Sequence, residues 1–125
     1  MKKLKTTEIK KVRDILLKKQ DYTCPLCGGK MKTSRDKAPA LDHNHTTGAI
    51  RDVLCINCNG IEGKIFNLAK RAKGKISVDE WLGNFLKYHD RHRTVQHGGL
   101  VHPSHKTEAE KRLARNKKAR ERRAA

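Results

Sequence analysis

The sequence is poor in aromatic and other large apolar side chains. Aromatic residues make up 4% of the 125 residues and all hydrophobic residues together 35%, whereas 34% are charged. Such a composition restricts the packed interior to a small one for this chain length. We therefore expect one compact unit with polar ends, held together by something besides apolar burial.

Long apolar runs are also absent from the sequence. No segment approaches the roughly 20 consecutive apolar residues that span a bilayer. Residues 1–11, MKKLKTTEIKK, are basic but have no apolar core of a signal peptide. We expect a soluble protein of the cytoplasm, which is the host cytoplasm if the chain is phage-encoded, and no membrane partner.

Acidic residues are few compared with basic ones. Thirteen Asp and Glu stand against 30 Lys and Arg, which leaves a formal net charge of +17. This is far more positive charge than solubility requires, and a polyanionic partner is its simplest explanation.

Hydrophobic periodicity predicts three helices and a hairpin within the first 90 residues. The third helix is preceded by a capping box, Ser77-Val-Asp-Glu80, with Ile76 and Trp81 placed for a hydrophobic staple. The expected elements are an amphipathic helix over 7–19, a polar loop over 30–40 ended by Pro39, a β-hairpin over 41–54 turning at Gly48, a helix over 59–73 closed by Gly74, and a helix from 77 to about 89 that buries Trp81, Leu82, Phe85 and Leu86.

The character of the chain changes after Tyr88. Residues 89–105 contain five histidines, a Gly-Gly pair and Pro103, and are typical of a linker without a core. Thr107 is placed to cap a last helix over 108–123. Leu113 is its only large apolar residue, so this helix is expected to be marginal alone in water.

Four cysteines form two Cys-x-x-Cys pairs with 27 residues between them: Cys24, Cys27, Cys55 and Cys58. Two such pairs complete a tetrahedral Zn²⁺ site. Two disulfides are the alternative, but they need an oxidising compartment of which the sequence gives no sign. Because every ligand is a cysteine, no coordination position stays open for water, and the zinc is expected to be structural.

The segment between the two cysteine pairs contains oxygen and nitrogen ligands. Asp42 and, directly after the last cysteine, Asn59 each offer a side-chain oxygen suited to a hard divalent cation such as Mg²⁺. His43, next to Asp42 but expected on the other face of its strand, can act as a neutral base near pH 7. The alternative is that these side chains only cap the turn or orient a cysteine.

Together these residues resemble the HNH nucleases and, within them, the phage recombination endonuclease VII-like family. The motif Leu-Asp-His-x-His…Gly-x-x-Arg…Leu-Cys-x-x-Cys-Asn-x-x-Glu-Gly is matched from Leu41 through Gly63. Asn44 stands where an acidic residue would be expected between the two histidines. The resemblance implies a metal-dependent DNA endonuclease that hydrolyses phosphodiester bonds, with one Mg²⁺ or Mn²⁺ ion in the catalytic site.

The resemblance also implies roles for individual residues. Asp42 and Asn59 would be metal ligands, and His43 the general base that activates water. Glu62, one helical turn after Asn59, would make a supporting metal or water contact. His45 and Arg51 would hold the scissile phosphate, although Arg51 could equally be an exposed strand residue.

The fold class expected is α+β, a small ββα-metal (His-Me finger) nuclease core held together by zinc, with flanking helices and a basic C-terminal tail. The organisation expected is an N-terminal amphipathic helix over 1–20, the zinc-bound nuclease core over 21–74, a packing helix over 75–90, a linker over 91–106 and a basic DNA-binding tail over 107–125.

Several functional alternatives stay open at this point. A non-catalytic zinc-ribbon protein that binds nucleic acid would use the same charge and the same cysteines. If the protein is a nuclease, a junction-resolving enzyme and a nicking or homing enzyme that cuts ordinary duplex DNA are both open. A homodimer is also open. In the tail, Lys111, Arg112 and Arg115 are expected to contact DNA phosphates, and a solvated charged helix is the alternative.

Overall fold

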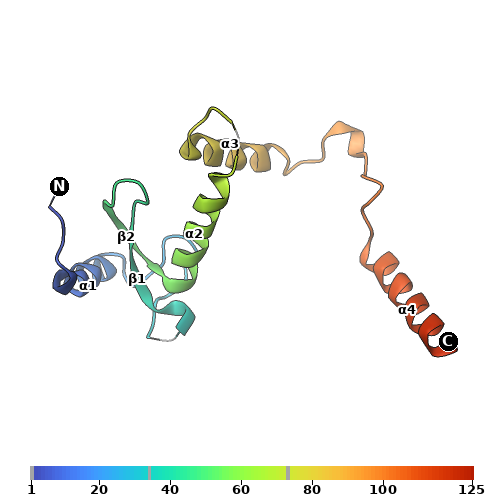
Figure 1. The fold of residues 1–125 in the computed structure, drawn as a ribbon, viewed down its shortest axis with the longest axis horizontal. Coiled ribbons are helices and arrows are strands. Elements are labelled where there is room, and N and C mark those ends of the chain that lie inside the picture. The colour runs from blue at the N-terminus through green and yellow to red at the C-terminus, as the bar shows by residue number, and fades with distance from the viewer. Residues whose placement is uncertain (1, 34, 73) are drawn as a thin grey trace. The chain divides into compact units, whose positions relative to one another are not determined.

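A computed structural model describes residues 2–33, 35–72 and 74–125 of the chain (Figure 1). They form a mixed α+β fold, as expected. The chain divides into two compact units, Met1–Asn84 and Phe85–Ala125. The elements described are α1 (Ile9–Lys19), β1 (Pro39–His43), β2 (Ile50–Cys55), α2 (Ile56–Ala69), α3 (Val78–Arg91), α4 (Glu108–Ala124) and three 3₁₀ turns at Thr6–Glu8, Arg35–Lys37 and His97–Gly99.

The two strands form the predicted hairpin. They are antiparallel, with Leu41 opposite Val53 and His43 opposite Ile50, and the register shifts between Leu41 and His43. The turn is built by Asn44, whose Oδ1 accepts hydrogen bonds from the backbone N–H groups of Thr46 and Thr47 at 2.8 and 2.9 Å. Gly48 closes the turn with φ of +78°, a conformation that favours glycine. Asn44 therefore has a structural role in the turn.

The core of the first unit is small and lies around the hairpin. Val53, Cys24 and Cys55 are its fully buried side chains, and both α1 and α2 pack against the two strands (Figure 1). Gln20, just after α1, exchanges two hydrogen bonds of 2.8 Å with the backbone N–H and carbonyl of Val53. This amide completes the backbone hydrogen bonding of β2 and joins the end of α1 to the hairpin.

The helix and loop bounds differ from those expected. The α-helix α1 begins at Ile9 because a 3₁₀ turn takes Thr6–Glu8. Pro39 begins β1 rather than ending a loop. The helix α2 begins at Ile56, where the sulfur of Cys55 accepts a hydrogen bond from the backbone N–H of Cys58, and it ends at Ala69. Lys73, the end expected from the sequence, lies outside the described residues.

The prediction that α3 buries its four large apolar residues is wrong. Trp81 and Leu82 are half-buried, whereas Phe85 and Leu86 are 43% and 68% exposed. Phe85 and Leu86 belong to the second unit, in which no described side chain is buried. The predicted cap is present, since the backbone N–H of Glu80 donates to Ser77 Oγ at 3.1 Å.

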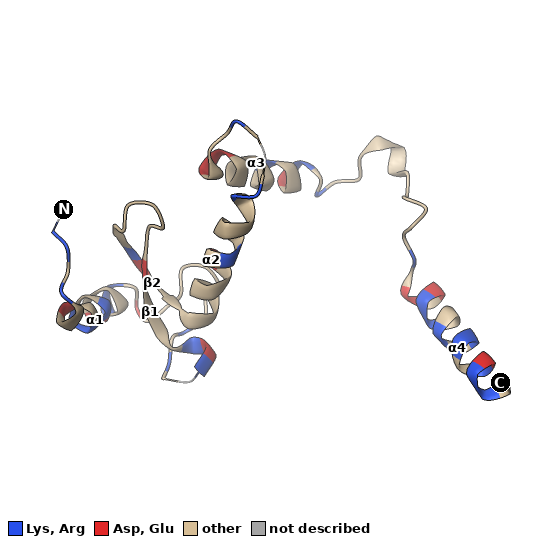
Figure 2. Cartoon of the chain, viewed as in Figure 1, with Lys and Arg blue, Asp and Glu red and all other residues tan. Residues whose placement is uncertain are grey.

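In the second unit, α4 follows the sequence prediction closely. Thr107 is its N-cap and accepts a hydrogen bond from the backbone N–H of Glu110 at 3.1 Å. Figure 2 shows that Lys and Arg positions recur along the length of α4. Among the described residues, no helix has the length and apolar character needed to cross a bilayer.

Candidate active site

The four cysteines meet at one place in the first unit. Their sulfur atoms all lie within 4.8 Å of one another, and three of the four side chains are buried. Backbone N–H groups point at two of the sulfurs: that of Cys55 donates to Cys24 Sγ at 3.5 Å, and that of Cys58 to Cys55 Sγ at 3.4 Å. All four thiols are free of disulfides. This donor set fits a closed, structural Zn²⁺ site.

The pKa values of these thiols are moved apart by their surroundings. Burial raises the pKa of Cys24, but backbone hydrogen bonds from Cys27, Cys55 and Leu26 outweigh it and lower that pKa to about 6. Burial and the neighbouring sulfurs raise the pKa of Cys58 to about 12. Four sulfurs this close cannot all carry negative charge without a compensating cation, and Zn²⁺ would supply that charge.

The buried carboxylate of Asp42 is held by Arg51 from the neighbouring strand. Asp42 is 6% exposed and lies where the register of the hairpin shifts, an irregularity that redirects a side chain. Arg51 donates to both carboxylate oxygens, from Nε at 2.7 Å and from Nη2 at 3.0 Å. The hydrogen bond and the charge of Asp42 raise the pKa of Arg51. This is a bidentate, charge-assisted pair.

The same guanidinium reaches a second carboxylate on α2. Arg51 Nη2 lies 3.0 Å from Glu62 Oε2, and this oxygen lies 2.7 Å from Nε2 of His45. The His45 ring stacks on Phe66 with 4.7 Å between centroids. Asp42, Arg51, Glu62 and His45 thus form one chain of polar contacts, which we call the Arg51 network.

The Arg51 network allows a test of whether a divalent cation fits this site. Two carboxylates, one from β1 and one from α2, converge on a single positive group. The guanidinium provides the positive charge that a metal ion would otherwise provide to these carboxylates. Carboxylate oxygens are the ligands that Mg²⁺ and Mn²⁺ prefer. The residues present therefore fit a hard divalent ion.

His43 lies outside the Arg51 network and faces solvent. It is exposed while its neighbour Asp42 is buried, as alternation along a strand dictates. Its ring centroid lies 6.2 Å from that of His45. Asn59 is half-buried in the first turn of α2, three residues before Glu62 and so on the same side of the helix.

The other candidate residues from the sequence lie in the second unit. Lys111, Arg112 and Arg115 are exposed on α4. Sequence reasoning also missed two features of the site. These are the Arg51 bridge and the stacking of Phe66 under His45. The stacking of Phe66 could have been predicted from sequence, because Glu62 and Phe66 are four residues apart on one helix and therefore lie on the same face.

Comparison with known proteins gives one family. A family model described as recombination endonuclease VII matches residues 1–96, which include every residue of the cysteine cluster and of the Arg51 network. No individual curated protein matches the chain significantly.

Proposed function

The chain belongs to the recombination endonuclease VII family, and from this premise we propose that it is a metal-dependent DNA endonuclease that hydrolyses phosphodiester bonds. The observation that carries the proposal is the convergence of Asp42 and Glu62 on one cationic group, with the exposed imidazole of His43 6.2 Å from that of His45, which contacts Glu62. A nuclease of the HNH type needs the same parts, which are a cation held by oxygen ligands and a nearby base.

In the proposed mechanism, Asp42 and Asn59 would hold Mg²⁺ or Mn²⁺, with Glu62 in a supporting contact. When bound, this ion supplies positive charge for the phosphorane and for the departing 3′ oxygen. His43 takes the proton from the water that attacks phosphorus, and its solvent-facing position on β1 gives it access to that water.

His45 is suited to contact the scissile phosphate because its ring is held on both sides. Glu62 Oε2 lies within hydrogen-bond distance of the Nε2 atom of His45, at 2.7 Å, and the Phe66 ring stacks on the face of the imidazole. A group whose orientation is set in advance loses little freedom when the substrate binds. Arg51 would contact the same phosphate once the carboxylates are neutralised by the divalent ion.

The zinc proposed at the cysteine cluster has a positioning role. Cys55 and Cys58 lie at the end of β2 and in the first turn of α2, directly before Asn59. A tetrahedral ion at these cysteines would hold the strand and the helix that carry Arg51, Asn59 and Glu62 in a constant relation.

The decisive experiment uses the full-length, zinc-loaded protein on a supercoiled plasmid and on a synthetic four-way junction. Reactions contain Mg²⁺, Mn²⁺ or no added divalent cation. We expect cleavage only with the added cation, and His43→Ala should lower its rate by about two to four orders of magnitude, the usual size of a general-base contribution. Binding to DNA should be nearly unchanged.

The matched control is His105→Ala, since His105 is an exposed histidine of the second unit. It should cleave like the unaltered protein. Full activity of His43→Ala would refute the assignment of the base. Binding without cleavage under every metal would identify a non-catalytic zinc protein that binds nucleic acid. Faster cleavage of the junction than of the plasmid would make the substrate branched DNA.

A further inference from the structure

A cleft lies beside His43, whose ring centroid is 6.2 Å from that of His45 in the Arg51 network. It has a volume of about 560 Å³, within the range of roughly 300 to 1,000 Å³ that is usual for small-molecule sites. Three stretches distant in sequence form its walls: residues 2–4 with Ile9, the strand positions His43 and Ile50, and the turn residues 47–49.

The charges on the walls of this cleft are all positive. Lys2 and Lys3 line it, and none of its lining residues is acidic. The Glu8 carboxylate lies close to one of these lysines, with its Oε2 3.5 Å from Lys2 Nζ, whereas the Asp42 carboxylate is buried and bonded to Arg51. An anionic group that enters the cleft would meet the ammonium group of Lys3, that of Lys2 in competition with Glu8, and the His43 imidazole.

The segment that carries the two lysines is held in place by Glu8. Its Oε1 accepts a hydrogen bond from the backbone N–H of Lys5 at 3.1 Å, and its Oε2 lies 3.5 Å from Lys2 Nζ. Glu8 directly precedes α1, which packs on the hairpin. The lysines are thus attached to the same framework as His43.

The remaining walls are apolar. Leu4 is half-buried, and Ile9 and Ile50 are 39% and 41% exposed. These three side chains offer a surface of the kind on which a sugar or the face of a base can lie. A cleft with apolar walls, a few polar groups and one sign of charge is typical of a site for an amphipathic anion.

We propose that this cleft is a nucleotide subsite of the nuclease. Lys2 and Lys3 pair with a phosphate adjacent to the one that is attacked, and the attached nucleoside lies against Leu4, Ile9 and Ile50. The inference rests on the proposed function because His43, the proposed base, lines the same cleft. The ligand class is a DNA strand with its phosphates, and the lysines position that strand for attack.

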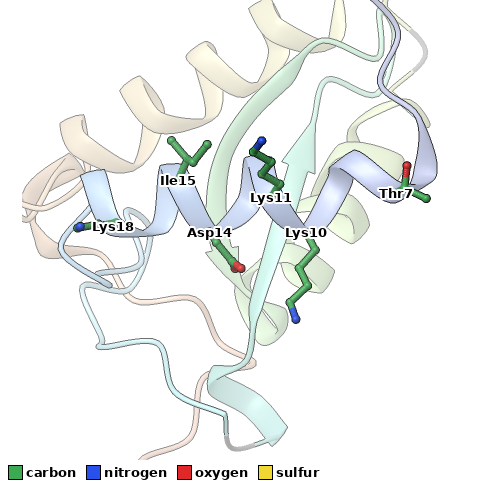
Figure 3. A pocket seen from close by; sticks show the side chains of 6 residues that line it. All are labelled: Thr7, Lys10, Lys11, Asp14, Ile15 and Lys18. Atoms are coloured by element: carbon green, nitrogen blue, oxygen red, sulfur yellow. The ribbon is translucent and has the colours of Figure 1, made fainter.

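A second depression runs along α1 and supplies the control (Figure 3). Its lining side chains come from one continuous stretch, residues 7–18, and Figure 3 shows Lys10, Lys11 and Lys18 pointing in different directions. Asp14 adds a negative charge to the same surface. These lysines are positively charged like Lys2 and Lys3, but they do not point toward one place.

The test compares two double variants of the full chain, Lys2→Ala/Lys3→Ala and Lys10→Ala/Lys18→Ala. Each removes two positive charges from exposed positions. The first probe is the dinucleotide pdTpdT, added without Mg²⁺ or Mn²⁺ and followed by methyl NMR at Ile9 and Ile50. We expect both methyl signals to shift, and the affinity for pdTpdT to fall about tenfold in the cleft variant only.

The second probe is a short DNA duplex, whose affinity is measured as a function of salt. The cleft variant should lose about 0.9 in the slope of log affinity against log salt, because the two lysines pair with one phosphate. Unmoved methyl signals, or equal losses in the two variants, would overturn the subsite. A protein that binds pdTpdT at these methyls but cuts no DNA would contradict the proposed function and leave the subsite standing.

Discussion

At the scale of single residues, Arg51 explains how two carboxylates can lie close together before any metal is bound. Asp42 is buried, and a buried carboxylate without a partner is costly. Arg51 supplies that partner, and its Nη2, which donates to Asp42, also contacts Glu62. The guanidinium and a divalent ion therefore compete for the same carboxylate oxygens. The affinity of the site for the ion then depends on the free energy needed to break the contacts of Arg51.

Arg51→Ala should lower stability and strengthen metal binding at the same time. Removing one partner of a fully buried ion pair costs about 3 to 5 kcal/mol. The Arg51 side chain is 36% exposed, so we expect a smaller loss, of about 1 to 3 kcal/mol. Urea unfolding of the zinc-loaded protein measures it.

The same unfolding experiment with added Mn²⁺ distinguishes the two effects of Arg51. Mn²⁺ should restore more stability to Arg51→Ala than it adds to the unaltered protein, because a ligand stabilises the state that it binds. Arg13→Ala is the matched control, since Arg13 pairs with an exposed carboxylate, that of Asp14. Equal responses of all three proteins to Mn²⁺ would show that Arg51 does not occupy the metal site.

At the scale of elements, α2 connects the cysteine cluster to the proposed chemistry. Its first turn contains Cys58 and Asn59, and its next turns carry Glu62 and Phe66. Because the core of this unit is small, apolar packing alone would hold α2 weakly. Metal binding at the cluster would add its free energy to that of folding.

Cys58→Ser should therefore unfold the first unit, and the unaltered chain should contain one zinc atom. Structural zinc sites contribute about 10 to 16 kcal/mol at neutral pH. Circular dichroism and elemental analysis check the two expectations. Ser77→Ala serves as the control, because it removes an exposed cap worth about 1 kcal/mol. A folded, zinc-free Cys58→Ser protein would contradict this role for the cluster.

The pH dependence of zinc retention follows from the cysteine pKa values. The pKa of Cys24 is depressed from 9.0 to about 6, so its thiolate is present at neutral pH and is lost as the pH falls through about 6. Because protons compete with zinc for sulfur, the apparent zinc affinity should fall more steeply with pH below about 6. Zinc uptake at pH 7 should also release protons, since the pKa of Cys58 is raised to about 12.

At the scale of the whole molecule, the net charge of +17 is spread over both units, and much of it lies on α4. Residues 106–125 contain nine Lys or Arg and three Glu. The positions 111, 115, 118 and 122 are all basic, and their spacing of four, three and four places them on one face of the helix. Residues after 96 lie outside the family match, so this basic helix is an addition to the part that the family model describes.

Deleting residues 106–125 should weaken DNA binding without abolishing cleavage. Each phosphate contact releases counterions, so the slope of log affinity against log salt should fall by about 0.9 per lost contact. Fluorescence anisotropy over a range of salt concentrations measures the slope, and cleavage at saturating protein measures the chemistry. Full-length affinity and slope in the truncated protein would show that the tail serves another partner.

A pair of double variants tests whether α4 binds DNA as a helix with one basic face. Lys111→Ala/Arg115→Ala removes charge from that face, and Lys117→Ala/Arg120→Ala removes the same charge away from it. The first should lower the affinity for a duplex more than the second. Equal losses would indicate that the tail binds as an extended polycation.

Features that depend on residue spacing and side-chain chemistry could be predicted from the sequence. Two Cys-x-x-Cys pairs predict that the four cysteine sulfurs meet at one place in the fold. A turn glycine between two short strands predicts a hairpin, and Thr107 predicts the start of α4. The compound motif from Leu41 to Gly63 was enough to indicate the family. The roles of Asp42, His43 and Asn59 stay predictions.

Which of these residues touch depends on how the strands and helices pack together. The contacts of Arg51 with Asp42 and Glu62 join β1, β2 and α2, and their geometry depends on a register shift that no local pattern reveals. The exposure of Phe85 and Leu86 could not be predicted from the sequence for a related reason. Helical periodicity predicts which side chains share an apolar face but not how much of that face is covered, and Phe85 and Leu86 stay 43% and 68% exposed.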